Sequence, residues 1–94
     1  MTHHATPHDE QDLPLPTVPP GRWARVCAIA GGRGAASRLA HLGLMPGHAL
    51  RMVRPSRFGP VLVDVKGSRL ALGQGLARKI SVRQIDSPAA ARPA

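Results

Sequence analysis

The residues with the clearest metal-binding chemistry lie close to the N-terminus. His3, His4 and His8 are followed directly by Asp9 and Glu10. Imidazole nitrogens and carboxylate oxygens are ligands that suit iron, zinc and nickel. A flexible segment, however, loses conformational entropy for every ligand that it fixes around an ion. The three histidines are therefore weak candidates for a metal site, and we expect no bound cofactor.

The other reactive side chains do not form a catalytic group. Asp64 and Asp86 are the only acids between residues 21 and 86, so the sequence offers no close pair of carboxylates for acid–base catalysis. Cys27 is the only cysteine, which excludes a disulfide framework, and its place in an apolar run favours a small buried hydrophobe. His41 and His48 have no Cys, Asp or Glu beside them in the sequence. We therefore expect a protein that is not an enzyme.

A glycine-rich segment, Gly31-Gly32-Arg33-Gly34, precedes the one good helical stretch. Free amides at the start of a helix attract anions, and Arg33 would add positive charge. The segment lacks the Lys-Ser/Thr ending of a phosphate-binding loop. We interpret it as a plain loop, with incidental anion affinity or a nucleotide site as weaker alternatives.

Positive charge dominates the centre of the chain. Residues 21–86 contain 12 of the 13 Lys and Arg residues but only two acids, which gives this part a net charge of +10. Such a body attracts a negatively charged partner. Arg54, Arg57 and Phe58 lie together at the end of one expected strand and in the loop after it. Three interpretations stay open: a solvated face, a docking surface for an acidic protein, and a contact for nucleic acid or lipid.

The hexapeptide at residues 42–47, LGLMPG, combines a helix stop with a turn. Gly43 is placed to act as a left-handed C-terminal cap, and Pro46-Gly47 has the residue order of a tight turn. The hexapeptide is either purely structural or also part of an apolar, partner-binding patch, a use to which adaptable methionine is suited. The patch would comprise Leu42, Leu44 and Met45.

Length and composition indicate one small globular domain. The chain has 94 residues, of which 43% are hydrophobic and only 2% aromatic. This length excludes the large enzyme folds, and no apolar run approaches the ~20 residues that a membrane helix needs. The N-terminus has no apolar signal-peptide stretch, and the single cysteine fits a reducing compartment. We expect a soluble, cytoplasmic protein.

Apolar alternation predicts a mainly β fold of about five short strands with one short helix after the first strand. The expected strands span residues 23–30, 48–54, 61–66, 69–72 and 80–85, and the helix spans residues 35–42. Imperfect alternation in the first strand predicts a bulge or an early end. Because eight residues are too few for a stable isolated helix, the helix must dock on the sheet. Closing such a sheet on itself gives a small barrel.

The two ends of the chain are expected to lie outside this domain. Residues 1–20, rich in proline and histidine, are expected to form a disordered tail whose residues 13–20 are an extended, polyproline-like tether. Residues 16–19 also fit the PxxP pattern of a recognition-module ligand. The folded domain is expected at residues 21–86, with a second disordered tail at residues 87–94.

From about residue 21 to residue 84 the sequence resembles the FeoA family of ferrous iron transport proteins. The signature RL…LGLxPG is matched by Arg38, Leu39, Leu42, Gly43, Leu44, Pro46 and Gly47. The downstream strands fit as well. The resemblance implies an SH3-like barrel with the helix inserted after the first strand. Iron-dependent repressors contain the same barrel beside a helix-turn-helix domain, for which this chain has no room.

The resemblance also implies a function: a non-catalytic accessory protein that docks on the cytoplasmic part of the membrane ferrous iron transporter FeoB and modulates it. Such a partner would recruit the protein to the inner face of the membrane. The residues expected to contact the partner are Leu42, Leu44, Met45, Arg54, Arg57 and Phe58. The alternative is a small basic β-barrel that binds nucleic acid, although we expect no specific nucleic-acid partner. An open sheet edge would also allow weak homo-oligomers.

Overall fold

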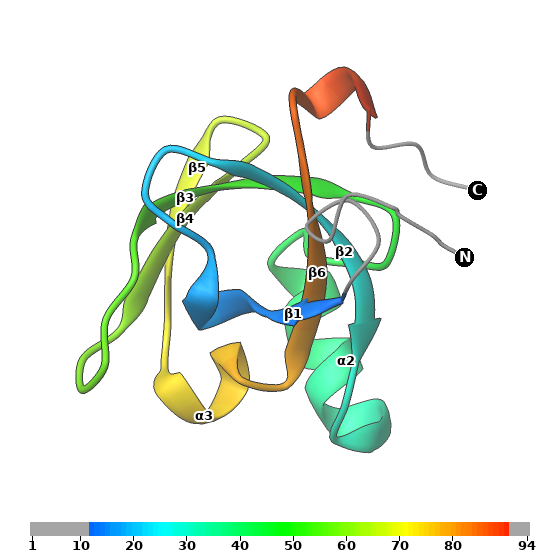
Figure 1. Cartoon of the computed structure of the whole chain (residues 1–94). Helices are drawn as coiled ribbons and strands as arrows, with labels where there is room; N and C mark the ends of the chain where they lie inside the picture. The colour runs from blue at the N-terminus through cyan, green and yellow to red at the C-terminus, as the bar shows by residue number, and fades with distance from the viewer. Residues whose placement is uncertain (1–11, 91–94) are drawn as a thin grey trace, which may run out of the picture.

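The computed structural model describes residues 12–90 and confirms the mainly β architecture (Figure 1). One antiparallel sheet of six strands has the order β1-β6-β2-β3-β4-β5. The strands are β1 (Leu13–Pro14), β2 (Trp23–Ile29), β3 (Ala49–Arg54), β4 (Val61–Val65), β5 (Ser68–Leu72) and β6 (Ile80–Ile85). The helices are the 3-10 turns η1 (Leu15–Thr17) and η2 (Pro88–Ala90) and the α-helices α2 (Gly32–His41) and α3 (Gln74–Ala77).

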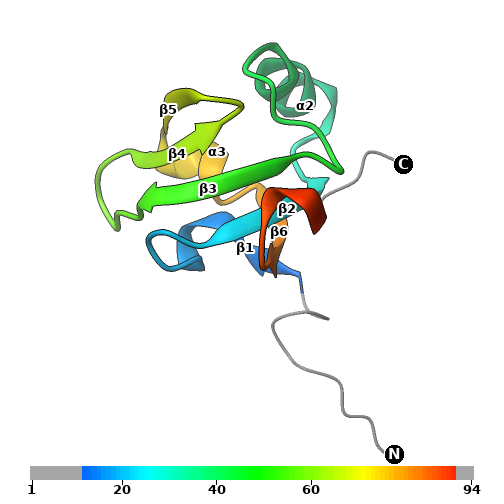
Figure 2. The ribbon, with the colours of Figure 1, turned by 90° about the horizontal axis from the view of Figure 1, so that it is seen from above.

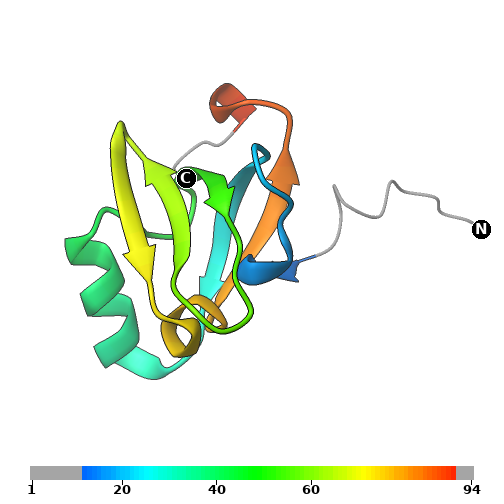
Figure 3. The same ribbon diagram turned by 90° about the vertical axis from the view of Figure 1, so that its left-hand side faces the viewer.

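The sheet curls on itself, as Figures 1 and 3 show from two sides, and it encloses an apolar core. Strand β4 has the period-two pattern of a strand with one buried face: Val61, Val63 and Val65 are buried and Leu62 and Asp64 are not. Strand β6 buries Ile80 and Val82 in the same way. In β2 the register against β6 shifts between Val26 and Ala28, which confirms the predicted bulge.

The expected domain boundary at Gly21 is too late. Leu13 lies opposite Val82 in the β1–β6 pair, so the chain joins the sheet eight residues earlier than the sequence indicated. The side chains of Leu15 and Val18 are completely buried. Because of its prolines, this segment was interpreted as a tether. Proline is, however, tolerated at the edge of a sheet and in a first helical turn. The segment is therefore a structural part of the domain, and not a tether; residues 1–11 lie outside the described part of the chain.

Pairing in the sheet leaves a seam between its two end strands, β1 and β5. The short helices η1 and α3 lie against each other across this seam. Leu15 from η1, Leu72 from β5 and Ala77 from α3 are all buried beneath it. The seam is thus closed by side-chain packing, whereas hydrogen bonds hold the rest of the sheet together.

The C-terminal boundary also differs from the expected one. Residues 88–90 form η2, which lies beside β2 and does not belong to a disordered tail. Pro88 and Trp23 line the same surface hollow. Figure 2 shows η2, in red, above the end of β6. Residues 91–94 lie outside the described residues.

Helix α2 begins three residues earlier than predicted and ends one residue earlier, and the predicted glycine cap is present. Its first residue is Gly32, so only Gly31 of the glycine-rich segment lies outside the helix. At the other end, Gly43 has φ +89°, its amide donates to the carbonyl of Ala40 (3.0 Å), and the amide of Leu44 donates to the carbonyl of Leu39 (2.9 Å). This pair of bonds is the Schellman motif, which satisfies carbonyls that the helix itself leaves free.

The turn that follows helix α2 directs the chain into β3. Gly47 has φ +93°, and the His48 amide donates to the Met45 carbonyl at 3.1 Å, so the predicted Pro46-Gly47 turn is present. The turn amide of Gly47 donates in addition to the carbonyl of Val26 (2.7 Å), which ties the turn to β2. The hexapeptide therefore has a structural role, while the side chains of Leu42 and Met45 remain exposed.

Replacing Leu15 tests whether η1 belongs to the core. Leu15→Ala should lower the free energy of unfolding by about 2–5 kcal/mol, because it removes a fully buried side chain and leaves a cavity. Phe58→Ala is the control, since its side chain is 94% exposed and its loss should change stability by less than about 0.5 kcal/mol. Urea unfolding of both variants measures the difference, and equal stability of the two would contradict the new boundary.

Two glycine-to-alanine changes at opposite ends of α2 should change the stability of the protein in opposite directions. Gly43→Ala forces alanine into a left-handed conformation and should cost about 1–2 kcal/mol of stability. Gly34→Ala lies within the helix with open space around its Cα, and should stabilise by about 0.5–1 kcal/mol. Thermal unfolding followed by circular dichroism compares them, and a stabilising Gly43→Ala would argue against the cap.

Candidate functional site

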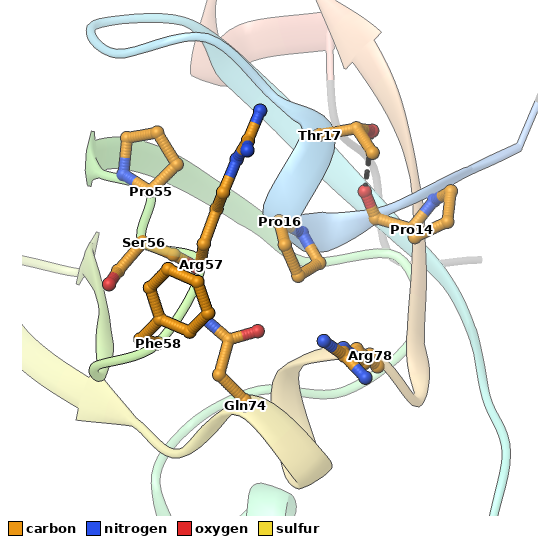
Figure 4. A pocket seen from close by; sticks show the side chains of 9 residues that line it. All are labelled: Pro14, Pro16, Thr17, Pro55, Ser56, Arg57, Phe58, Gln74 and Arg78. Atoms are coloured by element: carbon orange, nitrogen blue, oxygen red, sulfur yellow. Dashed lines mark hydrogen bonds between the residues drawn. The ribbon is translucent and has the colours of Figure 1, made fainter.

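A groove of about 830 Å³ opens on the outer surface of the seam (Figure 4). Three separate segments build it: the β1–η1 segment, the loop between β3 and β4, and α3 with the residue that follows it. Its lining residues are Pro14, Pro16 and Thr17 from the first segment, Pro55, Ser56, Arg57 and Phe58 from the second, and Gln74 and Arg78 from the third. We call this feature the seam groove.

Gln74 holds the β3–β4 loop in place. Its side-chain amide Nε2 donates to the carbonyl oxygens of Ser56 and Gly59, the latter at 3.0 Å. Within the loop, the Ser56 hydroxyl accepts a hydrogen bond from the Gly59 amide at 2.8 Å. Because these bonds fix the loop on both sides of Phe58, the exposed ring is presented on an ordered support. Figure 4 shows Phe58 beside Gln74, with Pro14 and Thr17 on the other side of the groove.

Two arginines of the groove have no protein partner among residues 12–90. Neither Arg57 nor Arg78 makes a side-chain hydrogen bond or an ion pair with any described residue. Arginines elsewhere differ: Arg69 pairs with Asp64 at 3.0 Å, and Arg83 pairs with Asp12 at 2.7 Å. The hydrogen bond from each of these guanidiniums lowers the pKa of its carboxyl partner. The seam groove therefore has positive charge that the described part of the chain does not neutralise.

The structure brings together some of the predicted contact residues and separates others. Arg57 and Phe58 both line the seam groove, and Arg54 is exposed at the end of β3 just before it. Leu42 and Met45 are 42% and 40% exposed, but they lie near the far end of β4. Gly43, which lies between them in the sequence, is close to the side chain of Val65, the last residue of β4. The loop that carries Phe58 instead precedes Val61, the first residue of β4.

Leu44 was expected in the surface patch, and this is wrong. Its side chain is completely buried in the core. The physical reason is the Schellman motif, in which the residue after the capping glycine folds back on the last turn of the helix. Of the three residues expected in the patch, only Leu42 and Met45 are exposed.

Sequence reasoning missed Pro14, Pro16 and Gln74 as site residues. The prolines fell in the segment that was interpreted as a tether. The sequence did contain a signal for a structured segment, because Leu13 and Leu15 alternate with these prolines, and an apolar side chain such as Leu15 favours burial. Gln74 gave no signal, since its partners are 15 and 18 residues away in the sequence.

No cluster of three or more His, Cys, Asp or Glu residues that could hold a metal ion occurs within residues 12–90. The weak metal candidates His3, His4 and His8 lie outside the described residues. Cys27 is half-buried, and burial is the main cause that raises the pKa of its thiol. The thiol is therefore protonated near neutral pH, a form that is a poor nucleophile and a poor metal ligand.

The fold and the site define a class of protein. A curled antiparallel sheet with one helix after β2 is the architecture of a small SH3-like barrel, and its groove offers apolar rings and cations for binding. No helix within residues 12–90 has the length and apolar character needed to cross a bilayer. The chain belongs to the FeoA family, whose domain model matches residues 13–84.

Comparison with individual proteins agrees with this assignment. An Fe(2+) transport protein A from Methanocaldococcus jannaschii is 38% identical over 73 residues, which cover 78% of this chain and 88% of the relative. A solved structure of an iron uptake regulatory protein (FeoA) matches with a TM-score of 0.75 and 35% identity, covering 80% of this chain and 100% of that one. The match also begins before Gly21, since the domain model starts at residue 13.

The same fold occurs within larger proteins. A manganese-dependent transcriptional repressor matches with a TM-score of 0.71 at 21% identity, over 79% of this chain but only 42% of the repressor. At this level of identity the similarity shows the fold alone. The match is consistent with the expectation that repressors contain this barrel as one of their parts.

Gln74→Leu tests whether one side chain orders the loop that carries Phe58. The change keeps most of the volume but leaves the carbonyls of Ser56 and Gly59 without their donor, which should cost about 1–3 kcal/mol. Amide hydrogen exchange should become faster at Gly59, and should stay unchanged at Leu44 at the end of α2. Unchanged exchange at Gly59 would show that the loop is ordered without Gln74.

Proposed function

We propose that this protein is a non-catalytic accessory protein of ferrous iron uptake, which docks on the cytoplasmic part of the FeoB transporter and modulates it. Membership of the FeoA family and the similarity to an Fe(2+) transport protein A support the link to iron uptake. One structural observation carries the docking role. The Phe58 ring is 94% exposed on a loop that hydrogen bonds hold in place, next to two arginines without partners in the described residues.

An exposed ring on an ordered support is a suitable anchor for a partner. Burying a Phe side chain contributes about 1.5–3 kcal/mol, and fixing the loop beforehand reduces the entropy lost on binding. The surrounding arginines add electrostatic steering toward an acidic face, which raises the association rate more than the affinity. Arg54 and Arg57 lie on the same side of the molecule as the ring and serve this purpose.

This protein can modulate the transporter if it binds one conformation of the transporter more tightly than another. A docked protein shifts its partner's conformational equilibrium only by the difference in its affinity for the two conformations. Leu42 and Met45, at the other end of β4, give this protein a second exposed apolar contact. When only one arrangement of the partner engages both contacts on the rigid barrel, the second contact increases the difference in affinity between the two arrangements.

The nucleic-acid alternative is not favoured. Proteins that hold single strands use successive aromatic rings as stacking platforms, and this chain has one exposed ring, Phe58. The weak homo-oligomer stays a prediction. Of the two end strands, β5 is the longer and would be the edge for such pairing.

Binding of this protein to its transporter can be measured directly. The immobilised full-length protein should bind the purified transporter, in detergent, at about 50 mM salt, and more weakly at about 300 mM because screening reduces electrostatic steering. Phe58→Ala should weaken binding about tenfold, the effect of losing one interface anchor. A folded wild-type protein that binds the transporter at neither salt concentration would overturn the proposed function.

A further inference from the structure

The walls of the seam groove are made of rings. Pro14 and Pro16 from the first segment, and Pro55 and Phe58 from the loop, present flat apolar surfaces to it. Proline has no amide hydrogen, so three of these four residues offer ring surface but no backbone donor. These three residues cannot donate the main-chain hydrogen bonds on which binding as an added β-strand depends.

The neutral polar groups of the groove are already engaged within the protein. The Thr17 hydroxyl donates to the carbonyl of Pro14 at 2.7 Å, and the Gln74 amide donates to the loop carbonyls. The charged side-chain donors of the groove are the guanidiniums of Arg57 and Arg78, which have no partner among the described residues. Guanidinium forms its strongest hydrogen bonds with carboxylate and phosphate oxygens. The groove thus selects an anionic occupant.

The combination of rings and cations favours an acidic peptide over nucleic acid. A nucleic acid would neutralise both arginines through its phosphates but could stack a base on Phe58 alone, leaving three proline rings without a matching surface. A peptide matches both features, because carboxylates can meet the arginines while apolar side chains cover the rings. The volume of about 830 Å³ exceeds that of a single side chain and accommodates several residues.

Grooves lined by rings are suited to extended chains. An extended or polyproline-type segment projects its side chains at short, regular intervals and needs no internal hydrogen bonds. We propose that the seam groove binds an extended acidic segment of the transporter's cytoplasmic part, with carboxylates on Arg57 and Arg78 and an apolar side chain on Phe58. This inference rests on the proposed function and names the chemistry of the partner at the same site.

Overlapping 15-residue peptides covering the cytoplasmic segments of the same organism's FeoB are the probes, each labelled for fluorescence polarisation with the full-length protein. We expect binding by peptides that combine Asp or Glu with apolar residues. The same peptides with Asp and Glu replaced by Asn and Gln should bind at least about tenfold more weakly, the effect of losing one well-placed charged contact. Equal binding of the acidic and the neutralised peptides overturns the proposal.

Matched charge reversals locate the binding surface. Arg57→Glu and Arg78→Glu should each weaken peptide binding about tenfold or more, whereas Arg33→Glu, with the same charge change on α2, should leave it nearly unchanged. Circular dichroism confirms that each variant is folded. Equal loss in all three variants would show an effect of net charge alone and would overturn the assignment to the groove.

Binding of the intact transporter separates the two proposals. If the transporter binds but no peptide does, and Arg57→Glu and Arg78→Glu leave transporter binding unchanged, this inference fails while the proposed function stands. If neither the transporter nor any peptide binds, both fail. If the two reversals abolish binding of a labelled single-stranded RNA while no peptide binds, the groove recognises nucleic acid and the inference is overturned.

Discussion

Closure of the seam between β1 and β5 is the constraint on which the rest of the structure depends. A domain of this size buries only about 60% of its unfolded surface, so it cannot leave one side of its core open. The two end strands are not hydrogen-bonded to each other, and the gap is instead filled by Leu15 from η1 and Ala77 from α3. The barrel is therefore completed by the packing of two short helices, η1 and α3, and not by hydrogen bonds between strands.

The same closure creates the surface that we propose to bind the partner. Because η1 and α3 must meet across the seam, their outer faces and the neighbouring β3–β4 loop leave a groove above the buried Leu15. Gln74 links the two roles, since it belongs to α3 and its amide holds the loop that carries Phe58. Stability is thus concentrated inside the seam, and the groups that can bind a partner lie directly outside it.

The sequence predicted the parts of the fold whose signals are local. Alternating valines in β4 and the glycine cap at Gly43 each depend on neighbours within a few residues, and both are present as expected. The prolines around Leu15 resembled a tether because the strand that they pair with, β6, lies about 70 residues further along the chain. For the site, Arg57 and Phe58 were found from their types, but their placement beside Gln74 depends on contacts with no sequence pattern.

The central claim is that the outside of the seam is the main surface that meets the partner. Amide chemical shifts of the isotope-labelled protein, titrated with the purified cytoplasmic part of FeoB, test this residue by residue. We expect the largest changes at Thr17, Phe58 and Gln74, around the groove. Changes confined to Leu42 and Met45, or no change at saturating partner, would contradict the account.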